Sequence, residues 1–141
     1  MRAFKCRSLW LLSVLFLITH SAMAELVVIV HPSNGDAINA KNVQRIFLGK
    51  EKKFPGGVKA SPINQVSSAA ARDQFDSNIL GRSTTQVSAY WSKLVFTGKG
   101  IPPKEVDNDA AVVAAVAADA SAIGYVDSSA VTGDVKALSI N

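Results

Sequence analysis

Cysteine and histidine are almost absent from this sequence of 141 residues. Its one cysteine is Cys6, and its two histidines are His20 and His31. Without a second thiol the chain can form no disulfide framework and no multi-thiolate metal site, and a histidine-based metal or catalytic centre lacks the necessary ligands. The Gly-x-Ser-x-Gly motif of many serine hydrolases is also missing. We therefore expect no enzyme, no bound metal and no cofactor.

A strong charge of one sign is missing as well. Residues 1–24 contain three of the 15 basic residues and none of the 11 acidic ones, so residues 25–141 carry a formal charge of +1. A protein that binds nucleic acid usually presents a dense basic face. The charge of residues 25–141 therefore argues against a nucleic-acid partner.

The first 24 residues have the order of regions found in a secretory signal peptide. Three basic residues are followed by an almost wholly apolar run over 9–18 and then by the small-x-small site 22–24. That run is shorter than the roughly 20 residues that span a membrane. We predict cleavage after Ala24, which leaves a periplasmic chain, residues 25–141, with one domain and no membrane anchor.

Strand and helix patterns alternate along residues 25–141. Apolar, β-branched runs predict strands over 26–30, 58–63, 123–126 and 135–140, and Pro62 confines the end of the second strand to a sheet edge or an exit from the sheet. Polar cap residues followed by apolar residues at helical spacing predict helices from Asn39, from Ser67 or Ser68, from Ser83 and from 107–109. This alternation is typical of an α/β fold, with a mixed or mostly parallel sheet flanked by helices.

The predicted helix starting at 83 has the most specific signals. Ser83 is followed three residues later by Gln86, which is the capping-box pattern. Its apolar face, Val87, Tyr90, Trp91, Leu94 and Val95, repeats at i, i+3, i+4, i+7 and i+8. We therefore predict that Trp91 belongs to the core.

The predicted helix near Ser67 and Ser68 is a candidate anion site. The N-terminus of a helix presents unpaired N–H groups and a partial positive charge. Alanines follow the serines, and no carboxylate occurs before Asp73. Arg72 could lean back toward the N-terminus and bind an oxyanion with its guanidinium. The alternative is an ordinary serine cap beside a surface arginine.

Several motifs resemble the phosphate-binding proteins of bacterial phosphate ABC transporters. Residues 43–50 resemble the IF-x-G-K helix end of that family, and residues 122–126 resemble its AIGYV strand. Residues 62–68 stand where the family has an arginine-serine-glycine-threonine loop that binds phosphate. Three further segments are similar to short, single-domain members of the family: 90–91, 96–100 and 102–103.

The resemblance implies a single periplasmic-binding-protein-like lobe that binds phosphate or a similar oxyanion weakly. Arg72 would replace the arginine of the family's loop. An ABC permease, a sensor kinase or a second copy of the chain would supply the missing wall of the cleft. The implied anion-binding residues are Asn64, Gln65, Ser67, Ser68, Ala69, Ala70 and Arg72.

Two functions remain open at this stage. Alanines in place of the loop glycine favour a ligand-free interaction or sensory module of the cell envelope that retains the lobe fold. The helix start without carboxylates favours a solute-binding-like protein with a role in transport. We prefer the second interpretation, because the family's anion position is still recognisable in the sequence.

Cleavage after Ala24 is directly testable. Mass spectrometry of the protein from a periplasmic extract should give the mass of a chain that begins at Glu25. A stable cytoplasmic protein that retains Met1 would contradict the predicted export.

Overall fold

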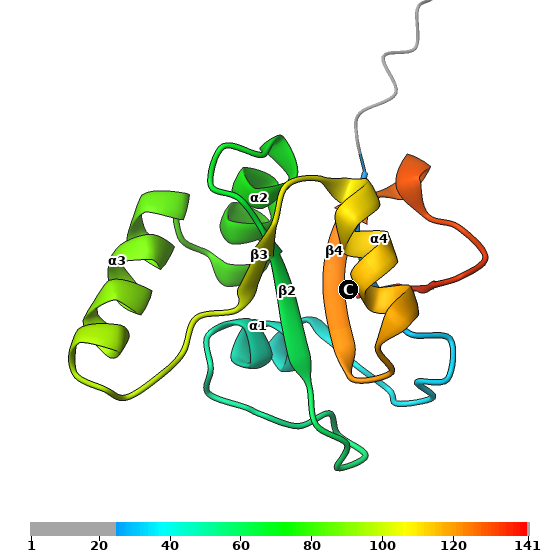
Figure 1. Cartoon of the computed structure of the whole chain (residues 1–141), viewed down its shortest axis with the longest axis horizontal. Coiled ribbons are helices and arrows are strands. Elements are labelled where there is room, and N and C mark those ends of the chain that lie inside the picture. Colours follow the sequence, from blue (N-terminus) through cyan, green and yellow to red (C-terminus); the bar gives the residue numbers. More distant parts are fainter. Residues whose placement is uncertain (1–24, 141) are drawn as a thin grey trace, which may run out of the picture.

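Residues 25–140, the part that the computed structural model describes, form a five-stranded mixed sheet with helices on both faces (Figure 1). The predicted signal peptide, residues 1–24, lies outside these residues. The strand order is β3-β2-β4-β1-β5. β2 is parallel to β3 and β4, whereas β1 is antiparallel to both of its neighbours. The sequence thus predicts the α/β class, and the structure has its mixed form.

The element bounds follow the chain order. The strands are β1 (Leu26–Val30), β2 (Ser61–Gln65), β3 (Lys104–Val106), β4 (Ala122–Asp127) and β5 (Lys136–Leu138). The α-helices are α1 (Ala40–Phe47), α2 (Ala70–Phe75), α3 (Thr84–Phe96) and α4 (Asp109–Ala118). A π-helical turn, η1 (Asp76–Leu80), continues α2, and a 3-10 turn, η2 (Ser128–Ala130), follows β4.

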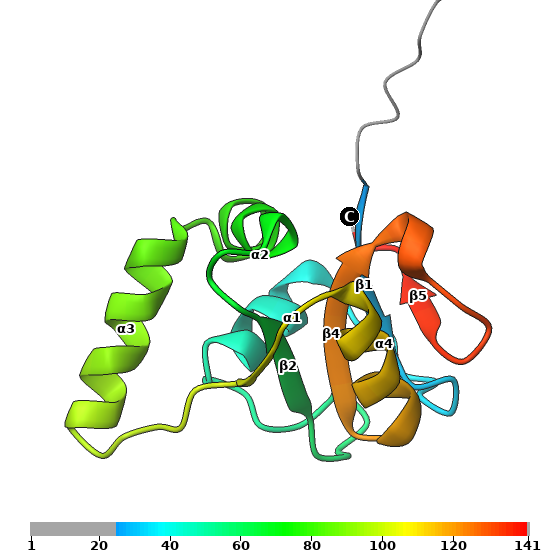
Figure 2. The same ribbon diagram turned by 45° about the horizontal axis from the view of Figure 1, so that its top comes forward.

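Each face of the sheet has its own apolar cluster. α4 covers one face, where the fully buried Val112 and Val116 belong to a cluster with apolar residues of β1, β2 and β4. α1 and α2 lie on the opposite face, where Phe47 and Phe75 pack with Tyr125 (Figure 2). The rings of Phe75 and Tyr125 are nearly parallel, with centroids 4.0 Å apart. Burial of each such ring contributes about 1.5–3 kcal/mol, so these clusters hold the layers together.

A glycine in β4 allows α4 to approach the sheet closely. A Cβ atom at Gly124 would lie 2.5 Å from Cγ1 of Val112, a separation that real contacts do not reach. The residues that α4 buries are Val112 and Val116, and the partly buried Ala115 and Ala117 pack against the same cluster. The AIGYV strand therefore has a packing role that depends on its glycine.

The second strand differs from its prediction. β2 begins at Ser61 and lies inside the sheet, between β3 and β4. Pro62 pairs with Ile123 of β4, and the ladder with β3 begins only at Ile63. Proline has no N–H to donate, and no ladder hydrogen bond to β3 is lost, because β3 does not yet pair with β2 at this position. Pro62 therefore lies near the start of an interior strand, and not at an edge or exit at the end of the strand as predicted. β3 is an additional strand that its short, exposed sequence does not predict.

The predicted helix starts at Asn39 and Ser83 are confirmed. The Asn39 side chain accepts a hydrogen bond from the N–H of Asn42, and the Ser83 side chain accepts one from the N–H of Gln86. In each case the second side chain bonds back to the cap N–H, which completes a capping box. Asn108, within the predicted segment 107–109, caps α4.

Trp91 connects α3 to the rest of the protein. Its side chain is buried, and Cβ atoms at Gly49 and Gly100 would lie 2.7 and 3.1 Å from the indole ring. Gly49 also has a φ of +70°, which favours glycine on backbone grounds. The core prediction for Trp91 is confirmed. Val95 and Phe96, farther along α3, are exposed, so the C-terminal end of α3 projects from the body (Figure 2).

We expect Trp91→Ala to lower the free energy of unfolding by about 3–5 kcal/mol, because the lost indole leaves a cavity between α3 and the two glycines. Phe96→Ala, on the same helix but in solvent, should change it by less than about 0.5 kcal/mol. Denaturant unfolding of both variants measures the difference. Equal losses would contradict the anchoring role of Trp91.

Candidate functional site

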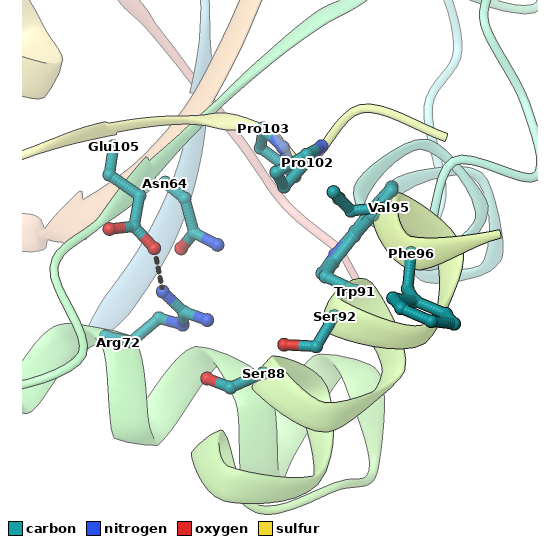
Figure 3. A pocket seen from close by; sticks show the side chains of 10 residues that line it. All are labelled: Asn64, Arg72, Ser88, Trp91, Ser92, Val95, Phe96, Pro102, Pro103 and Glu105. Carbon is teal, nitrogen blue, oxygen red and sulfur yellow. Dashed lines mark hydrogen bonds and ion pairs between the residues drawn. The ribbon is translucent and has the colours of Figure 1, made fainter. Parts of the chain in front are cut away.

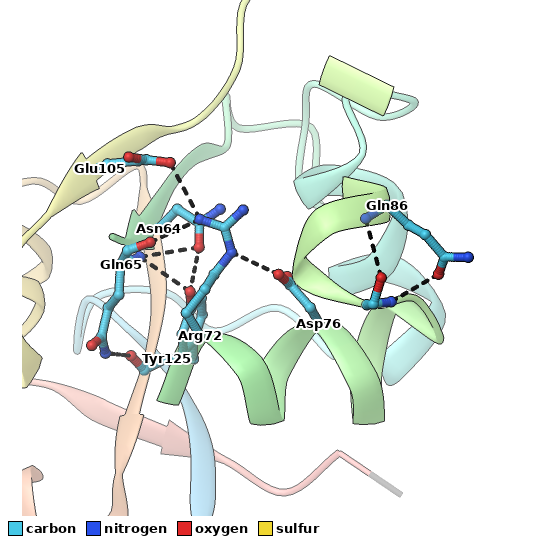
Figure 4. Close-up of polar contacts among 8 residues, drawn as sticks. Asn64, Gln65, Arg72, Asp76, Gln86, Glu105 and Tyr125 are labelled. Atoms are coloured by element: carbon cyan, nitrogen blue, oxygen red, sulfur yellow. Dashed lines mark hydrogen bonds and ion pairs between the residues drawn. The ribbon is translucent and has the colours of Figure 1, made fainter. Parts of the chain in front are cut away.

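Arg72 is buried at the junction of three elements (Figure 4). Its Nε donates a hydrogen bond to Oδ2 of Asp76 at 2.7 Å, and its Nη1 donates to the carbonyl oxygen of Gln65 at 2.8 Å. Nη1 also lies 3.2 Å from Oε1 of Glu105 on β3. Asp76 is fully buried, whereas the side chain of Glu105 is half exposed. The guanidinium therefore joins α2 and η1 to the end of β2 and to the middle of β3.

Asn64 and Gln65 extend this buried network (Figure 4). The Tyr125 hydroxyl donates to Oδ1 of Asn64, and the backbone N–H of Gln65 lies 3.0 Å from the same oxygen. Nε2 of Gln65 donates to Oδ1 of Asp109 at 2.7 Å and to the carbonyl oxygen of Tyr125 at 3.1 Å. Buried polar groups need such partners, and these contacts give both residues a structural role.

The charges around Arg72 disfavour a further anion. Burial acts to lower the pKa of Arg72, but the hydrogen bond and charge of Asp76 offset this effect and raise the pKa above its ordinary value. Burial also raises the pKa of the Tyr125 hydroxyl. Arg72 therefore remains a cation that two carboxylates already contact. An additional anion would meet a local excess of negative charge.

The start of α2 differs from the predicted anion site. α2 begins at Ala70, and Ala69 occupies the N-cap position without a side-chain hydrogen bond. Ser67 and Ser68 are exposed in the preceding turn, which the N–H of Ala69 closes by donating to the carbonyl oxygen of Val66 at 3.0 Å. The predicted cap at either serine is wrong, because this turn delays the helix.

Arg72 makes its side-chain contacts with Asp76, Gln65 and Glu105 rather than with the two serines. Its guanidinium reaches toward Asp76, one turn later, and no hydrogen bond joins it to either serine within residues 25–140. Asp73 lies in the first turn of α2 and adds a negative charge there. The structure thus brings Asn64, Gln65 and Arg72 together in one network, and leaves the serines and Ala70 outside it.

A pocket of about 470 Å³ lies between α3 and the edge formed by β2 and β3 (Figure 3). Asn64 and Arg72 each direct one nitrogen atom toward this pocket, and neither nitrogen donates a hydrogen bond to another described residue. The Ser88 and Ser92 hydroxyls point into the pocket from α3. Such donors suit a neutral acceptor such as a peptide carbonyl. The other lining residues are Glu105 and the apolar Trp91, Val95, Phe96, Pro102 and Pro103.

Four residues of this site escaped the sequence analysis. Asp76 had a local signal, since it follows Arg72 by four residues, the spacing of an ion pair on a helix. Glu105, Ser88 and Ser92 have none, because they reach the pocket only through the packing of β3 and α3. The π-helical turn at η1 carries Asp76, and such turns occur frequently at functional sites.

No protein-family model matches the sequence, and no curated protein matches it. Solved structures do resemble it. They include an ABC-type phosphate transport receptor from Vibrio cholerae, with a TM-score of 0.65, 16% identity, and 83% of this chain covered against 46% of the receptor. A putative phosphate ABC transporter substrate-binding protein with bound phosphate from Clostridium perfringens has a TM-score of 0.66 and 17% identity over 83% of this chain and 45% of that protein. PstS from Borrelia burgdorferi has a TM-score of 0.64 and 18% identity, with coverages of 84% and 47%.

These likenesses show the fold. The chain has the architecture of one lobe of a phosphate-binding protein of the ABC transporter type, and it spans about half the length of those proteins. They are named as binding or receptor proteins, and they are distant from this chain in sequence. No helix within residues 25–140 is both long and apolar enough to cross a membrane. Across the same residues no cluster of three His, Cys, Asp or Glu side chains could hold a metal ion.

The buried ion pair makes a specific prediction for Arg72. Arg72→Met should lower the free energy of unfolding by about 3–5 kcal/mol, because it leaves the carboxylate of Asp76 buried without its cation. The double variant Arg72→Met/Asp76→Leu should recover most of that loss, because both charges are removed. Denaturant unfolding of the single and double variants tests this coupling. Strictly additive losses would mean that the pair is not coupled.

Proposed function

We propose that this chain is a protein-interaction module of the cell envelope with the fold of a phosphate-binding lobe. An extended segment of a partner protein would insert an apolar side chain beside Trp91, and its backbone carbonyls would accept hydrogen bonds from Arg72 and Asn64. Export by the predicted signal peptide would bring the module to the periplasm. A sensor kinase or an ABC permease is a suitable class of partner there.

The observation that carries this proposal is the exposure of large apolar side chains around the pocket. Val95 and Phe96 line the pocket and are 52% and 92% exposed, and Ile101, which lines the neighbouring hollow, is 90% exposed in the loop that follows α3. Clustered apolar groups in solvent are typical of an interaction surface. β3 is the edge strand beside the pocket, and its free side suits an extended segment.

Weak binding of phosphate or a similar oxyanion is the second candidate. The fold likeness to phosphate-binding lobes supports it, and the unpaired N–H groups at the start of α2 would be its donors. The candidate site would combine Ser67, Ser68, Ala69 and Ala70 with the nearby Asn64, Gln65 and Arg72. It ranks second because Arg72 is already paired with Asp76 and Glu105.

A selection of displayed random peptides on the purified protein tests the first candidate. We expect selected peptides to share a bulky apolar residue. Ser92→Trp should weaken their binding at least about tenfold, equivalent to 1.4 kcal/mol, because the new indole fills the pocket. Ser67→Trp is the matched control, since Ser67 is an exposed serine outside the pocket and its replacement should leave binding unchanged.

Titration of the same protein with inorganic phosphate separates the two candidates. NMR amide signals of residues 66–72 should stay in place at millimolar phosphate. The oxyanion site would be favoured instead if phosphate shifted only those amide signals and if Ser92→Trp did not weaken the binding of any selected peptide.

A further inference from the structure

A second hollow, of about 780 Å³, adjoins the first pocket through Trp91, which lines both. It lies between the C-terminal ends of α1 and α3 and the hairpin over residues 52–60. Its charged lining residues are Lys52, Lys59 and Lys99, and it has no carboxylate in its lining. We call this region the lysine hollow.

The positive charge of the lysine hollow is only partly balanced from within the fold. The two ion pairs found within residues 25–140 both belong to Arg72, and none of these lysines takes part in one. The ends of α1 and α3 each contribute about half a negative charge. Those partial charges oppose three full positive charges and leave an excess of about two. Hydrogen bonds from Ser121 lower the pKa of Asp119, and Lys59 lies close enough for its positive charge to help lower it, but Asp119 does not line the hollow.

The hairpin places like charges opposite each other. Lys53 and Lys59 are direct partners across its antiparallel bridge, and the N–H of Ala60 donates to the carbonyl oxygen of Lys52 at 2.9 Å. Like charges at directly opposite positions destabilise a strand pair. An anionic partner beside Lys59 would reduce this repulsion, although Lys53 itself does not line the hollow.

We propose that the partner segment is acidic, with Asp or Glu residues beside its apolar anchor that bind in the lysine hollow. This inference rests on the proposed function and specifies the chemistry of its partner. The shared position of Trp91 supports it, because one segment could place its apolar side chain in the first pocket and its carboxylates beside Lys52, Lys59 and Lys99. A hollow of this size exceeds what a single inorganic oxyanion would fill.

Two synthetic peptides test the inference by titration of the purified protein. Both carry a central Leu-Phe pair, which is flanked by glutamates in one peptide and by glutamines in the other. The glutamate peptide should bind at least about tenfold more tightly, and higher salt should reduce this advantage. The triple variant Lys52→Gln/Lys59→Gln/Lys99→Gln should abolish it. The matched control Lys41→Gln/Lys93→Gln/Lys136→Gln removes the same charge from lysines outside the lining and should retain it.

The outcomes distinguish this inference from the proposed function. If both peptides bind equally well and Ser92→Trp abolishes their binding, the inference of an acidic partner is wrong, whereas the proposed interaction module is supported. Failure of both peptides and of the displayed peptides to bind would overturn both proposals. If the triple variant still binds the glutamate peptide more tightly than the glutamine peptide, the acidic contact lies outside the lysine hollow and the inference is wrong. Lysine-dependent binding to phosphatidylglycerol vesicles without a preference for the glutamate peptide would assign the lysines to a membrane surface, and would also overturn the inference.

Discussion

The contact on which this arrangement depends is the buried ion pair between Arg72 and Asp76. Through Arg72, the π-helical turn after α2 is joined to the carbonyl at the end of β2 and to Glu105 on β3. A buried charge that loses its partner is costly, so these elements are held in one relative position. The position of these elements also shapes the pocket beside α3, because Asn64, Arg72 and Glu105 of the same network line that pocket.

The same contact changes what the lobe is able to recognise. An arginine near a helix start suggests an anion clamp, but here its charge is neutralised by side chains of its own fold. Positive charge without an ion-pair partner lies instead in the lysine hollow, on the other side of Trp91. The exposed apolar residues Phe96 and Ile101 lie near the two hollows. These features support the proposal that the recognition surface lies beside α3 rather than at the start of α2.

Local features of the chain were the most predictable ones. The capping boxes at Asn39 and Ser83 each involve residues three positions apart, so the pattern is complete within a single turn. Burial of Trp91 also followed from helical spacing. The start of α2 was not predictable in this way, because either serine is a better cap than Ala69, and the start at Ala70 depends on how the preceding turn leaves β2.

The sequence by itself determined the order of strands and helices apart from β3, the α/β class and the likeness to phosphate-binding lobes, because periodicity, caps and short motifs depend on neighbouring residues. Only the tertiary structure decided the interior position of β2, the existence of β3 and the partners of Arg72. Glu105 lies 33 residues beyond Arg72, and its contact requires β3 to pair with β2. Contacts between residues so far apart depend on the packing of whole elements, which no local pattern encodes.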